Sequence, residues 1–165
     1  MKTITFIRHA KSDRKQDVPD FERPLNDRGN NDAPLMGKVI KSDFILPDLI
    51  ISSPANRAKT TAMLIAAEIG YAEQEILYLE YLYFADTETF LSIIRDIENN
   101  FESIYMISHN PGITYIVSRT SDTRLDHMPT CGVAQIQFDV QSWADIKDKS
   151  GKLMRFDKPK NHKKG

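Results

Sequence analysis

Cysteine is nearly absent from this sequence, since only one of its 165 residues, Cys131, is of that type. A single cysteine excludes an internal disulfide, and it excludes metal sites built from several cysteines. We therefore expect Cys131 to be a small, semi-apolar packing residue.

Long apolar runs are missing as well. No stretch approaches the roughly 20 consecutive apolar residues that a membrane-spanning helix needs. The apolar stretch at the N-terminus ends at Arg8, which is too early for a secretory signal. These absences predict a cytoplasmic protein that does not contact a membrane.

The chain also lacks an excess of charge of either sign. It has 22 basic and 23 acidic residues and a net charge of −1, so no overall field attracts nucleic acid. Any affinity for anions must come from a local group of side chains. The proportions of hydrophobic (41%) and charged (27%) residues are typical of a soluble globular protein.

The length fits one domain, which we place at residues 1–157, followed by a basic tail at residues 158–165 that we expect to be frayed. The pattern predicts strands at 1–7, 49–52, 76–79, 103–108 and 132–140, the last at a sheet edge, with a further candidate at 152–156. It predicts helices from Asn26 or Asp32 to 42, at 55–69, at 88–99 with Thr87 as N-cap, and at 111–118. Residues 10–25 form a charged loop. Alternating strands and helices predict a single-domain, three-layer α/β/α fold with a mostly parallel sheet.

Side chains suited to binding an anion follow three of these strands. Arg8 and His9 come directly after the first strand, Arg57 lies in the first turn of the helix after the second, and His109 follows the strand at 103–108. Ligands of such sheets bind beyond the carboxyl ends of the strands, so we expect these four residues to meet at one phosphate site.

One histidine of this group can act as a covalent nucleophile for a phosphoryl group, while the two arginines grip its oxygens. The second histidine adds a charged donor if it is protonated. A zinc site formed by His9 and His109 is disfavoured, because two arginines in the same place repel a cation. His127 and His162 are read as incidental, although His127 is a candidate for the rim of the site.

Three motifs carry a family resemblance: RHA at residues 8–10, SPANRAKTTA at 53–62 and SHNPG at 108–112. With this spacing, the sequence resembles the histidine phosphatase superfamily, which has the phosphoglycerate mutase-like fold. RPLNDRG at 23–29 and PTCGVAQIQF at 129–138 further resemble the small phosphohistidine phosphatase branch typified by SixA.

The resemblance implies a role for each matching residue. His9 would be the nucleophile that becomes phosphohistidine, and Arg8, Arg57 and His109 would complete the phosphate pocket. Ser12 and Asn110 are weaker candidates for flanking contacts. The implied reaction is a two-step transfer, first to His9 and then to water, with neither a metal nor another cofactor.

The sequence departs from larger members of this family in its short segment between Arg57 and His109, where they carry an acid that protonates the leaving group. Glu80 is a candidate for that acid, and a surface carboxylate is the alternative. A phosphoramidate nitrogen protonates readily and needs such an acid less, so protein phosphohistidine is the predicted substrate.

Three alternatives remain open. The first is a phosphatase whose substrate is a small phosphomonoester, the second is a mutase, and the third is a non-catalytic phosphate-binding module. The mutase is disfavoured because the chain has little from which to build a lid that shelters the intermediate from water.

Overall fold

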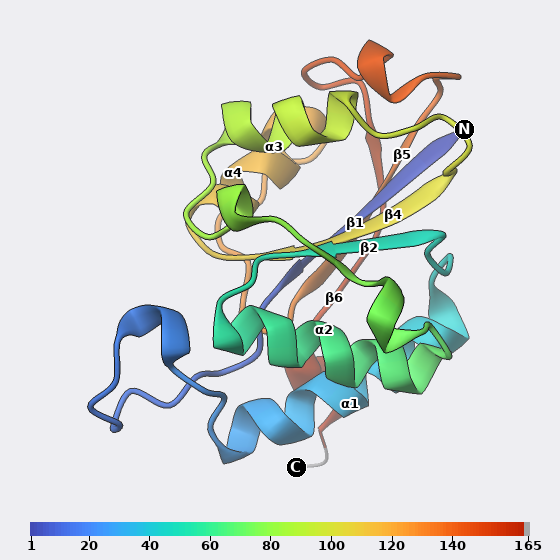
Figure 1. The fold of residues 1–165 in the computed structure, drawn as a ribbon. Helices are drawn as coiled ribbons and strands as arrows, with labels where there is room; N and C mark the ends of the chain where they lie inside the picture. The colour runs from blue at the N-terminus through green and yellow to red at the C-terminus, as the bar shows by residue number, and fades with distance from the viewer. Residues whose placement is uncertain (164–165) are drawn as a thin grey trace.

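The computed structural model describes residues 1–163, which form one twisted six-stranded sheet between two layers of helices (Figure 1). The strands are β1 (Lys2–Arg8), β2 (Leu49–Ser52), β3 (Leu77–Tyr78), β4 (Ser103–Ser108), β5 (Val133–Phe138) and β6 (Lys152–Asp157). The α-helices are α1 (Asp27–Asp43), α2 (Asn56–Ile69), α3 (Thr87–Arg95) and α4 (Gly112–Thr120). The predicted α/β fold class is confirmed.

The strand order is β3-β2-β4-β1-β5-β6. β1 and β4 pair in parallel at the centre, as do β2 with β4 and β2 with β3, whereas β5 pairs antiparallel with both β1 and β6. The prediction that residues 132–140 form an edge strand is therefore wrong. The final segment, β6, returns antiparallel and covers β5, so that β6 is the edge strand instead.

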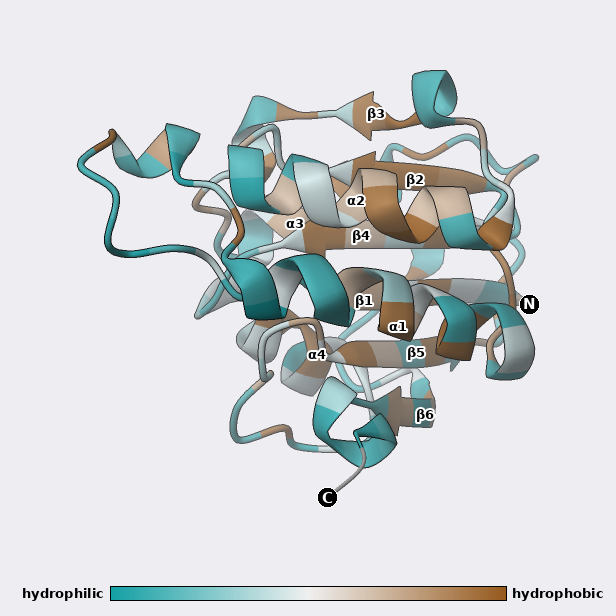
Figure 2. Ribbon diagram, turned by 90° about the horizontal axis from the view of Figure 1, so that it is seen from below, coloured by the Kyte–Doolittle hydropathy of each residue, from teal (hydrophilic) through white to brown (hydrophobic). Residues whose placement is uncertain are grey.

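Each face of the sheet has its own apolar core. Helices α1 and α2 cover one face over Ile50, Tyr105 and Ile107, and α3 and α4 cover the other over Ile104 and Met106. Figure 2 shows α1 and α2 side by side in front of the sheet, with α1 mostly teal and α2 largely tan and brown. β1 and β4 are both buried on both faces, and β4 has at residues 104–107 the continuous apolar run expected of a central parallel strand, whereas β1 alternates threonine with apolar residues.

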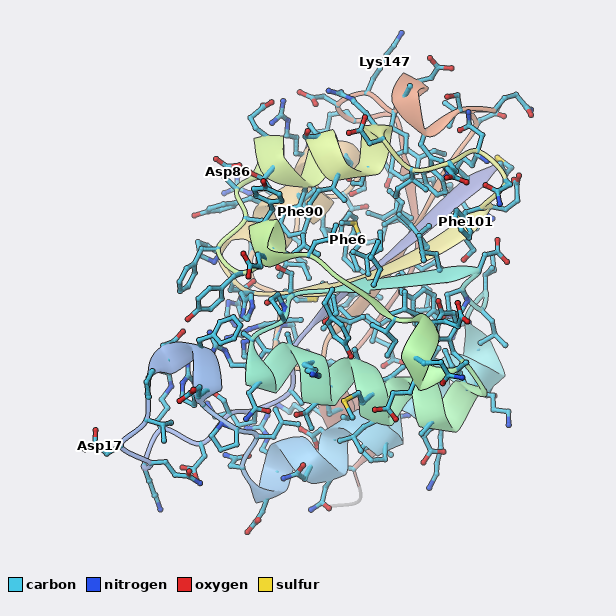
Figure 3. The ribbon with its side chains drawn as sticks, in the orientation of Figure 1. Phe6, Asp17, Asp86, Phe90, Phe101 and Lys147 are labelled. Atoms are coloured by element: carbon cyan, nitrogen blue, oxygen red, sulfur yellow. The ribbon has the colours of Figure 1, made fainter. Side chains whose placement is uncertain are left out.

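Aromatic packing fixes the second core. Phe6 of β1 meets Phe90 of α3 edge to face, with ring centroids 6.0 Å apart (Figure 3). This contact ties the strand that carries His9 to the helix layer above it.

Helix ends follow local chemistry. The side chain of Asn26 caps α1 by accepting a hydrogen bond from Gly29 N–H, and Gly70 ends α2 in the left-handed region with a φ of 78°. The predicted cap of α3, Thr87, is wrong by one residue, because the carboxylate of Asp86 accepts from Thr89 N–H. α3 also ends at Arg95, four residues earlier than predicted.

The loop at residues 10–25 projects from the carboxyl edge of the sheet, with Asp17 near its tip (Figures 1 and 3). It contains a short 3-10 helix, Asp20–Glu22, and its two ends are joined by a bridge between Ser12 and Leu25. A long loop that is pinned at both ends can hold one of its residues in a fixed position.

The C-terminal segment differs from the expected frayed tail. Residues 158–162 include a 3-10 helix, Pro159–His162, and His162 contacts the Asp157 carboxylate at 2.8 Å. Lys163 Nζ lies 2.8 Å from the buried carboxylate of Asp32 in α1. The remainder of the predicted tail, residues 164–165, lies outside the described residues.

None of the helices in residues 1–163 combines the length and the apolar composition needed to cross a membrane.

Candidate active site

The four residues predicted to form the site lie together beyond the carboxyl ends of three adjacent strands. Arg8 ends β1 and His9 follows it, Arg57 lies in the first turn of α2 directly after β2, and His109 follows β4. The imidazole centroids of His9 and His109 are 5.1 Å apart, and both side chains are buried. Parallel strands thus bring together residues that are up to 101 positions apart in the chain.

His9 has one ring nitrogen engaged and one free. Its Nδ1 lies 2.7 Å from the carbonyl oxygen of Ala10, an acceptor, so we assign the proton to Nδ1 and the lone pair to Nε2. Burial lowers the pKa of His9 well below its usual range, and the positive charges of Arg57 and Arg8 lower it further. The ring is therefore neutral near pH 7, which is the form that can act as a nucleophile.

The backbone around His9 is held by hydrogen bonds from distant segments. The Ala10 N–H donates to Thr61 Oγ1 in α2 at 2.9 Å. Cys131 N–H lies 3.0 Å from the Arg8 carbonyl oxygen and 3.1 Å from that of His9. The Cys131 side chain is fully buried and burial raises the pKa of its thiol, as expected of a packing residue.

His109 shows the complementary arrangement. Its Nε2 lies 2.7 Å from Ser53 Oγ, and its Nδ1 is buried without a partner. Burial, together with the nearby Arg57 guanidinium, lowers the pKa of His109 to about 3. Ser53 also accepts from Ala55 N–H, and we assign its hydroxyl proton to the bond with Nε2, so that the ring proton of His109 is on Nδ1.

The two arginines are anchored through their terminal nitrogens. Arg57 donates from Nη1 to the Asp20 carbonyl at 2.8 Å and from Nη2 to the Asp20 carboxylate at 3.0 Å. Arg8 donates from Nη1 to the Met128 carbonyl at 3.0 Å, and His127 Nε2 lies 3.5 Å from the same nitrogen. The expected position of His127, at the rim of the site, agrees with this exposed contact.

Unpartnered donors are concentrated at this site. Among residues 1–163, five buried side-chain polar atoms have no hydrogen-bond partner, and three of them belong to the site: Arg8 Nε, Arg57 Nε and His109 Nδ1. Buried polar groups are nearly always paired, so each exception calls for an explanation. These three atoms can all donate, and an anion with several acceptor oxygens is the complementary ligand.

Asp20 is a residue of the site that the sequence did not predict. Its carboxylate accepts from Tyr83 Oη at 2.5 Å and from Arg23 at 2.7 Å, as well as from Arg57. The bond from Tyr83, followed by those from the two arginines, holds the pKa of Asp20 well below its usual range. Asp20 is therefore an anion that occupies part of the Arg57 fork.

Tyr83 links this network to the second histidine. Its ring lies edge-on to His109 with centroids 5.6 Å apart, and the Arg57 guanidinium lies 5.9 Å from its centre. Asp20 and Tyr83 are 63 positions apart, so no local pattern marks either of them. Arg23 does lie in a quoted motif, RPLNDRG, which was the available signal for that residue.

The weaker candidates lie around the site. The Ser12 hydroxyl accepts a hydrogen bond from Arg23, while Asn110 donates to the Met128 carbonyl and accepts from Thr114 Oγ1. Glu80 is exposed in the 3-10 helix Glu80–Leu82, and in the described part of the chain its carboxylate has no hydrogen bond or ion pair with a site residue. Asp20, and not Glu80, is the carboxylate that contacts Arg57.

No group of three or more histidine, cysteine, aspartate or glutamate side chains within residues 1–163 is arranged to hold a metal ion. The site contains an imidazole with a free Nε2, that of His9, and three buried donors without a partner.

The chain is similar in sequence to known proteins. The sequence profile of the histidine phosphatase superfamily (branch 1) matches residues 4–82, which include Arg8, His9 and Arg57. Protein Rv1276c of Mycobacterium tuberculosis is 27% identical over 164 residues, covering 93% of this chain and the whole of that one.

Solved structures share the fold over nearly the whole chain. SixA of Agrobacterium tumefaciens is 26% identical with a TM-score of 0.80, covering 94% of this chain and 96% of that one. The protein histidine phosphatase SixA, in complex with tungstate, is 20% identical with a TM-score of 0.84 and coverages of 98% and 99%. More distant is the mycobacterial glucosyl-3-phosphoglycerate phosphatase Rv2419c, 12% identical with a TM-score of 0.70 and coverages of 96% and 98%. The chain is thus similar to the histidine phosphatase superfamily over residues 4–82, and it shares the fold of the SixA structures over nearly its whole length.

Proposed function

We propose that this protein is a metal-independent phosphatase that works through a phosphohistidine intermediate on His9. The observation that supports it best is the combination of a free, neutral His9 Nε2 with three buried donors that have no partner. The nucleophile and the charge-stabilising groups are then present in one place, as phosphoryl transfer requires.

In the first step, the Nε2 lone pair attacks phosphorus and the bond from phosphorus to the leaving group breaks. The leaving atom takes a proton from solvent water and departs. In the second step, a water molecule attacks the same phosphorus and gives a proton to solvent, the N–P bond breaks, and inorganic phosphate leaves as His9 regains its lone pair. Arg8, Arg57 and His109 stabilise the charge on the non-bridging oxygens in both steps, with Ser12 and Asn110 as flanking residues.

An incoming phosphoryl group has to compete with Asp20 for Arg57. Asp20 already uses both terminal nitrogens of that guanidinium, so the phosphoryl oxygens either share them or displace the carboxylate. Because the carboxylate is held ionised, Asp20 has no proton to donate to a leaving group at neutral pH. Asp20 is thus a positioning residue for Arg57 in this mechanism, not a general acid.

We propose protein phosphohistidine as the substrate, with cytoplasmic location as expected from the sequence. A phosphoramidate nitrogen is protonated more readily than an alkoxide oxygen, so its departure depends less on a general acid. Such a substrate suits this site, because the candidate acid Glu80 is exposed and its carboxylate makes none of the contacts described for the site.

A small phosphomonoester is the second candidate substrate. The likeness to the glucosyl-3-phosphoglycerate phosphatase favours it, because that protein has the same fold and its name specifies a small phosphoester. Rates with a phosphohistidine protein and with a panel of small phosphoesters, each compared with the His9→Ala variant, distinguish the two candidates.

The intermediate can be trapped directly. Phosphohistidine survives alkali and is hydrolysed by acid, so we predict that alkaline quenching in single-turnover experiments leaves label on the protein and that mass spectrometry places it on His9. Label on His109 would reverse the two roles, and absence of label during normal turnover would exclude the covalent path. Initial rates that fall in excess EDTA and return with one metal would contradict metal independence.

A further inference from the structure

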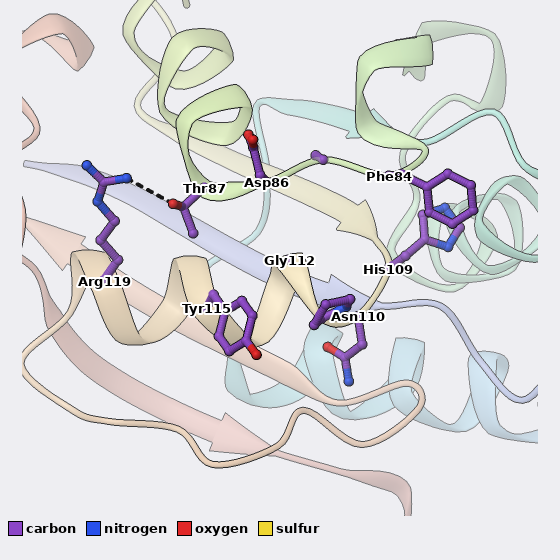
Figure 4. Close-up of a pocket in the computed structure, with 10 residues that line it drawn as sticks. Phe84, Asp86, Thr87, His109, Asn110, Gly112, Tyr115 and Arg119 are labelled. Carbon is purple, nitrogen blue, oxygen red and sulfur yellow. Dashed lines mark hydrogen bonds between the residues drawn. The ribbon is translucent and has the colours of Figure 1, made fainter.

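A groove that the proposed mechanism does not use begins at His109. It has a volume of about 500 Å³ and lies between the start of α3 and one side of α4, from Gly112 to Arg119 (Figure 4). His109 and Asn110 border one end, and Thr87 and Arg119 border the other. A molecule whose phosphoryl group is held at His9 and His109 can therefore extend into it.

Two exposed aromatic side chains line this groove. Phe84 is 72% exposed and Tyr115 is 61% exposed, although burial is the usual state for large apolar rings. Phe84 lies near His109, with ring centroids 6.3 Å apart, and Tyr115 projects from α4 (Figure 4). Exposed aromatic rings with a polar surround are typical of surfaces that bind another protein.

At the far end of the groove, the lining carboxylate of Asp86 has no cationic partner among residues 1–163. The lining guanidinium of Arg119 is already paired with the carboxylates of Glu88 and Asp148, which lie outside the lining. Asp86 is therefore the charged group of this groove that is available to pair with a cation. An adjoining hollow shares Tyr115 and Arg119 with the groove and is also lined by the basic side chains Arg124 and Lys149.

We propose that this groove binds the polypeptide segment next to the phosphohistidine of a protein substrate, and that the segment carries an apolar residue followed by a basic one. The apolar side chain packs between Phe84 and Tyr115, and the basic side chain reaches Asp86. This proposal rests on the proposed function, and it adds a sequence preference to it. The charges of the site support it, because Arg8 and Arg57 lie at the phosphoryl end and the Asp86 carboxylate, which has no cationic partner among residues 1–163, lines the groove away from them.

The test uses two groove variants with matched controls. Tyr115→Ala removes an aromatic wall, and Asp86→Asn removes the charge while keeping a side chain that can cap α3. Tyr81→Ala and Asp96→Asn are the controls, since Tyr81 is 77% exposed, Asp96 is exposed at the other end of α3, and neither lines the groove. Each variant is assayed with p-nitrophenyl phosphate and with a phosphohistidine peptide that has leucine and lysine beside the phosphorylated residue.

For Tyr115→Ala we expect the KM for the peptide to rise about tenfold, as for an interface anchor, with kcat/KM for p-nitrophenyl phosphate changed less than about twofold. Asp86→Asn should raise the peptide KM about threefold and abolish the preference for lysine over glutamate in the peptide. Equal effects on both substrates, or equal effects in the controls, would overturn the proposal. So would a loss confined to small aryl phosphates, which would make the groove a small-molecule subsite.

Binding separates this proposal from the proposed function. A stable phosphohistidine analogue in the same peptide is titrated into full-length His9→Ala protein by calorimetry, with and without Tyr115→Ala. Weaker binding in the double variant supports the groove even if the wild type fails to hydrolyse the phosphopeptide. Unchanged affinity refutes the groove even if hydrolysis is normal.

Discussion

The two histidines of the site differ in which ring nitrogen is free. His9 is oriented by a backbone carbonyl and keeps Nε2 free, whereas His109 is oriented by Ser53 and keeps Nδ1 free. One ring thus presents a lone pair and the other a donor. This difference is the basis for assigning the nucleophile to His9 and charge stabilisation to His109.

Arg57 provides a test of how the anion is held. We predict that Arg57→Ala lowers kcat/KM about 10²- to 10³-fold, since it removes a charged, bidentate donor. Arg57→Lys should restore only part of this loss, because an ammonium cannot reproduce the planar fork. Steady-state kinetics with p-nitrophenyl phosphate measure both effects.

Lys11→Ala is the control for Arg57→Ala, because Lys11 is a partly exposed cation in the loop at residues 10–25. Its loss should change kcat/KM less than threefold, as expected for a residue at the rim. If the two alanine variants lost activity equally, general electrostatic attraction would account for the effect of Arg57 and a specific grip would not.

At the scale of elements, the start of α4 has to approach the loop that carries Tyr83 and Phe84. A Cβ on Gly112 would lie 2.0 Å from the backbone oxygen of Ala85. We predict that Gly112→Ala destabilises the protein by about 1–3 kcal/mol, as overpacking does, and also lowers kcat/KM. Denaturant unfolding and kinetics on the same preparation measure the two effects.

Gly70→Ala is the matched control for that prediction. Gly70 has a φ of 78° but no atom within 4 Å of the position that a Cβ would take, and it ends α2 at the opposite end from Arg57. Its substitution should cost about 1–2 kcal/mol of stability through backbone strain and leave kcat/KM unchanged. Loss of activity in both variants would mean that Gly112→Ala acts through global stability alone.

Local chemistry explains which elements the sequence predicted well. The predicted strand at 103–108 has the bounds of β4, and the predicted helix at 55–69 differs from α2 by one residue. Both predictions depend on neighbouring residues alone, an apolar run for the strand and a terminal glycine for the helix. Residues 132–140 lie inside the sheet because β6, a strand that comes later in the sequence, pairs with β5. Asp20 reaches the site only through the conformation of a long loop, which has no periodicity to read.

In the site, too, some features could be predicted from the sequence and others depend on contacts between distant segments. Arg8, His9, Arg57 and His109 could be placed together because sheet topology brings strand ends to one edge. The bonds that set the states of these residues, from Ser53 to His109 and from Asp20 to Arg57, depend on side-chain packing that the sequence does not display.

At the scale of the whole molecule, the neutral histidines make stability depend on pH. The pKa values of His9 and His109 lie below the value of about 6.5 expected in the unfolded chain, so below pH 6.5 the unfolded state binds more protons, and for His109 this holds down to about pH 3. Their contribution is complete above pH 6.5 and is lost as the pH falls. For His109 we predict a loss of about 2 kcal/mol between pH 7 and pH 5, and we expect a loss of the same sign for His9.

Urea unfolding in buffers without phosphate, at pH 5 to 7, measures this slope and avoids the range in which carboxylates titrate. His109→Asn should reduce the slope by about one proton, which corresponds to about 1.4 kcal/mol per pH unit at its steepest. An unchanged slope in the variant would show that His109 is not held neutral.

The projecting loop has a practical consequence. Its tip carries Arg14 and Lys15, both exposed, and the strand before it is paired on one side with β4 and on the other with β5. We expect trypsin to nick the loop and the short N-terminal piece to stay in place, held also by the buried Lys2 ammonium on the carbonyls of Asn99 and Phe101. That piece carries His9 while the larger one carries Arg57 and His109. A peptide that ends at Arg14 or Lys15 is short enough for chemical synthesis. Histidine analogues with imidazoles of graded basicity could therefore replace His9 by semisynthesis, and they would show how the rate depends on the basicity of the nucleophile.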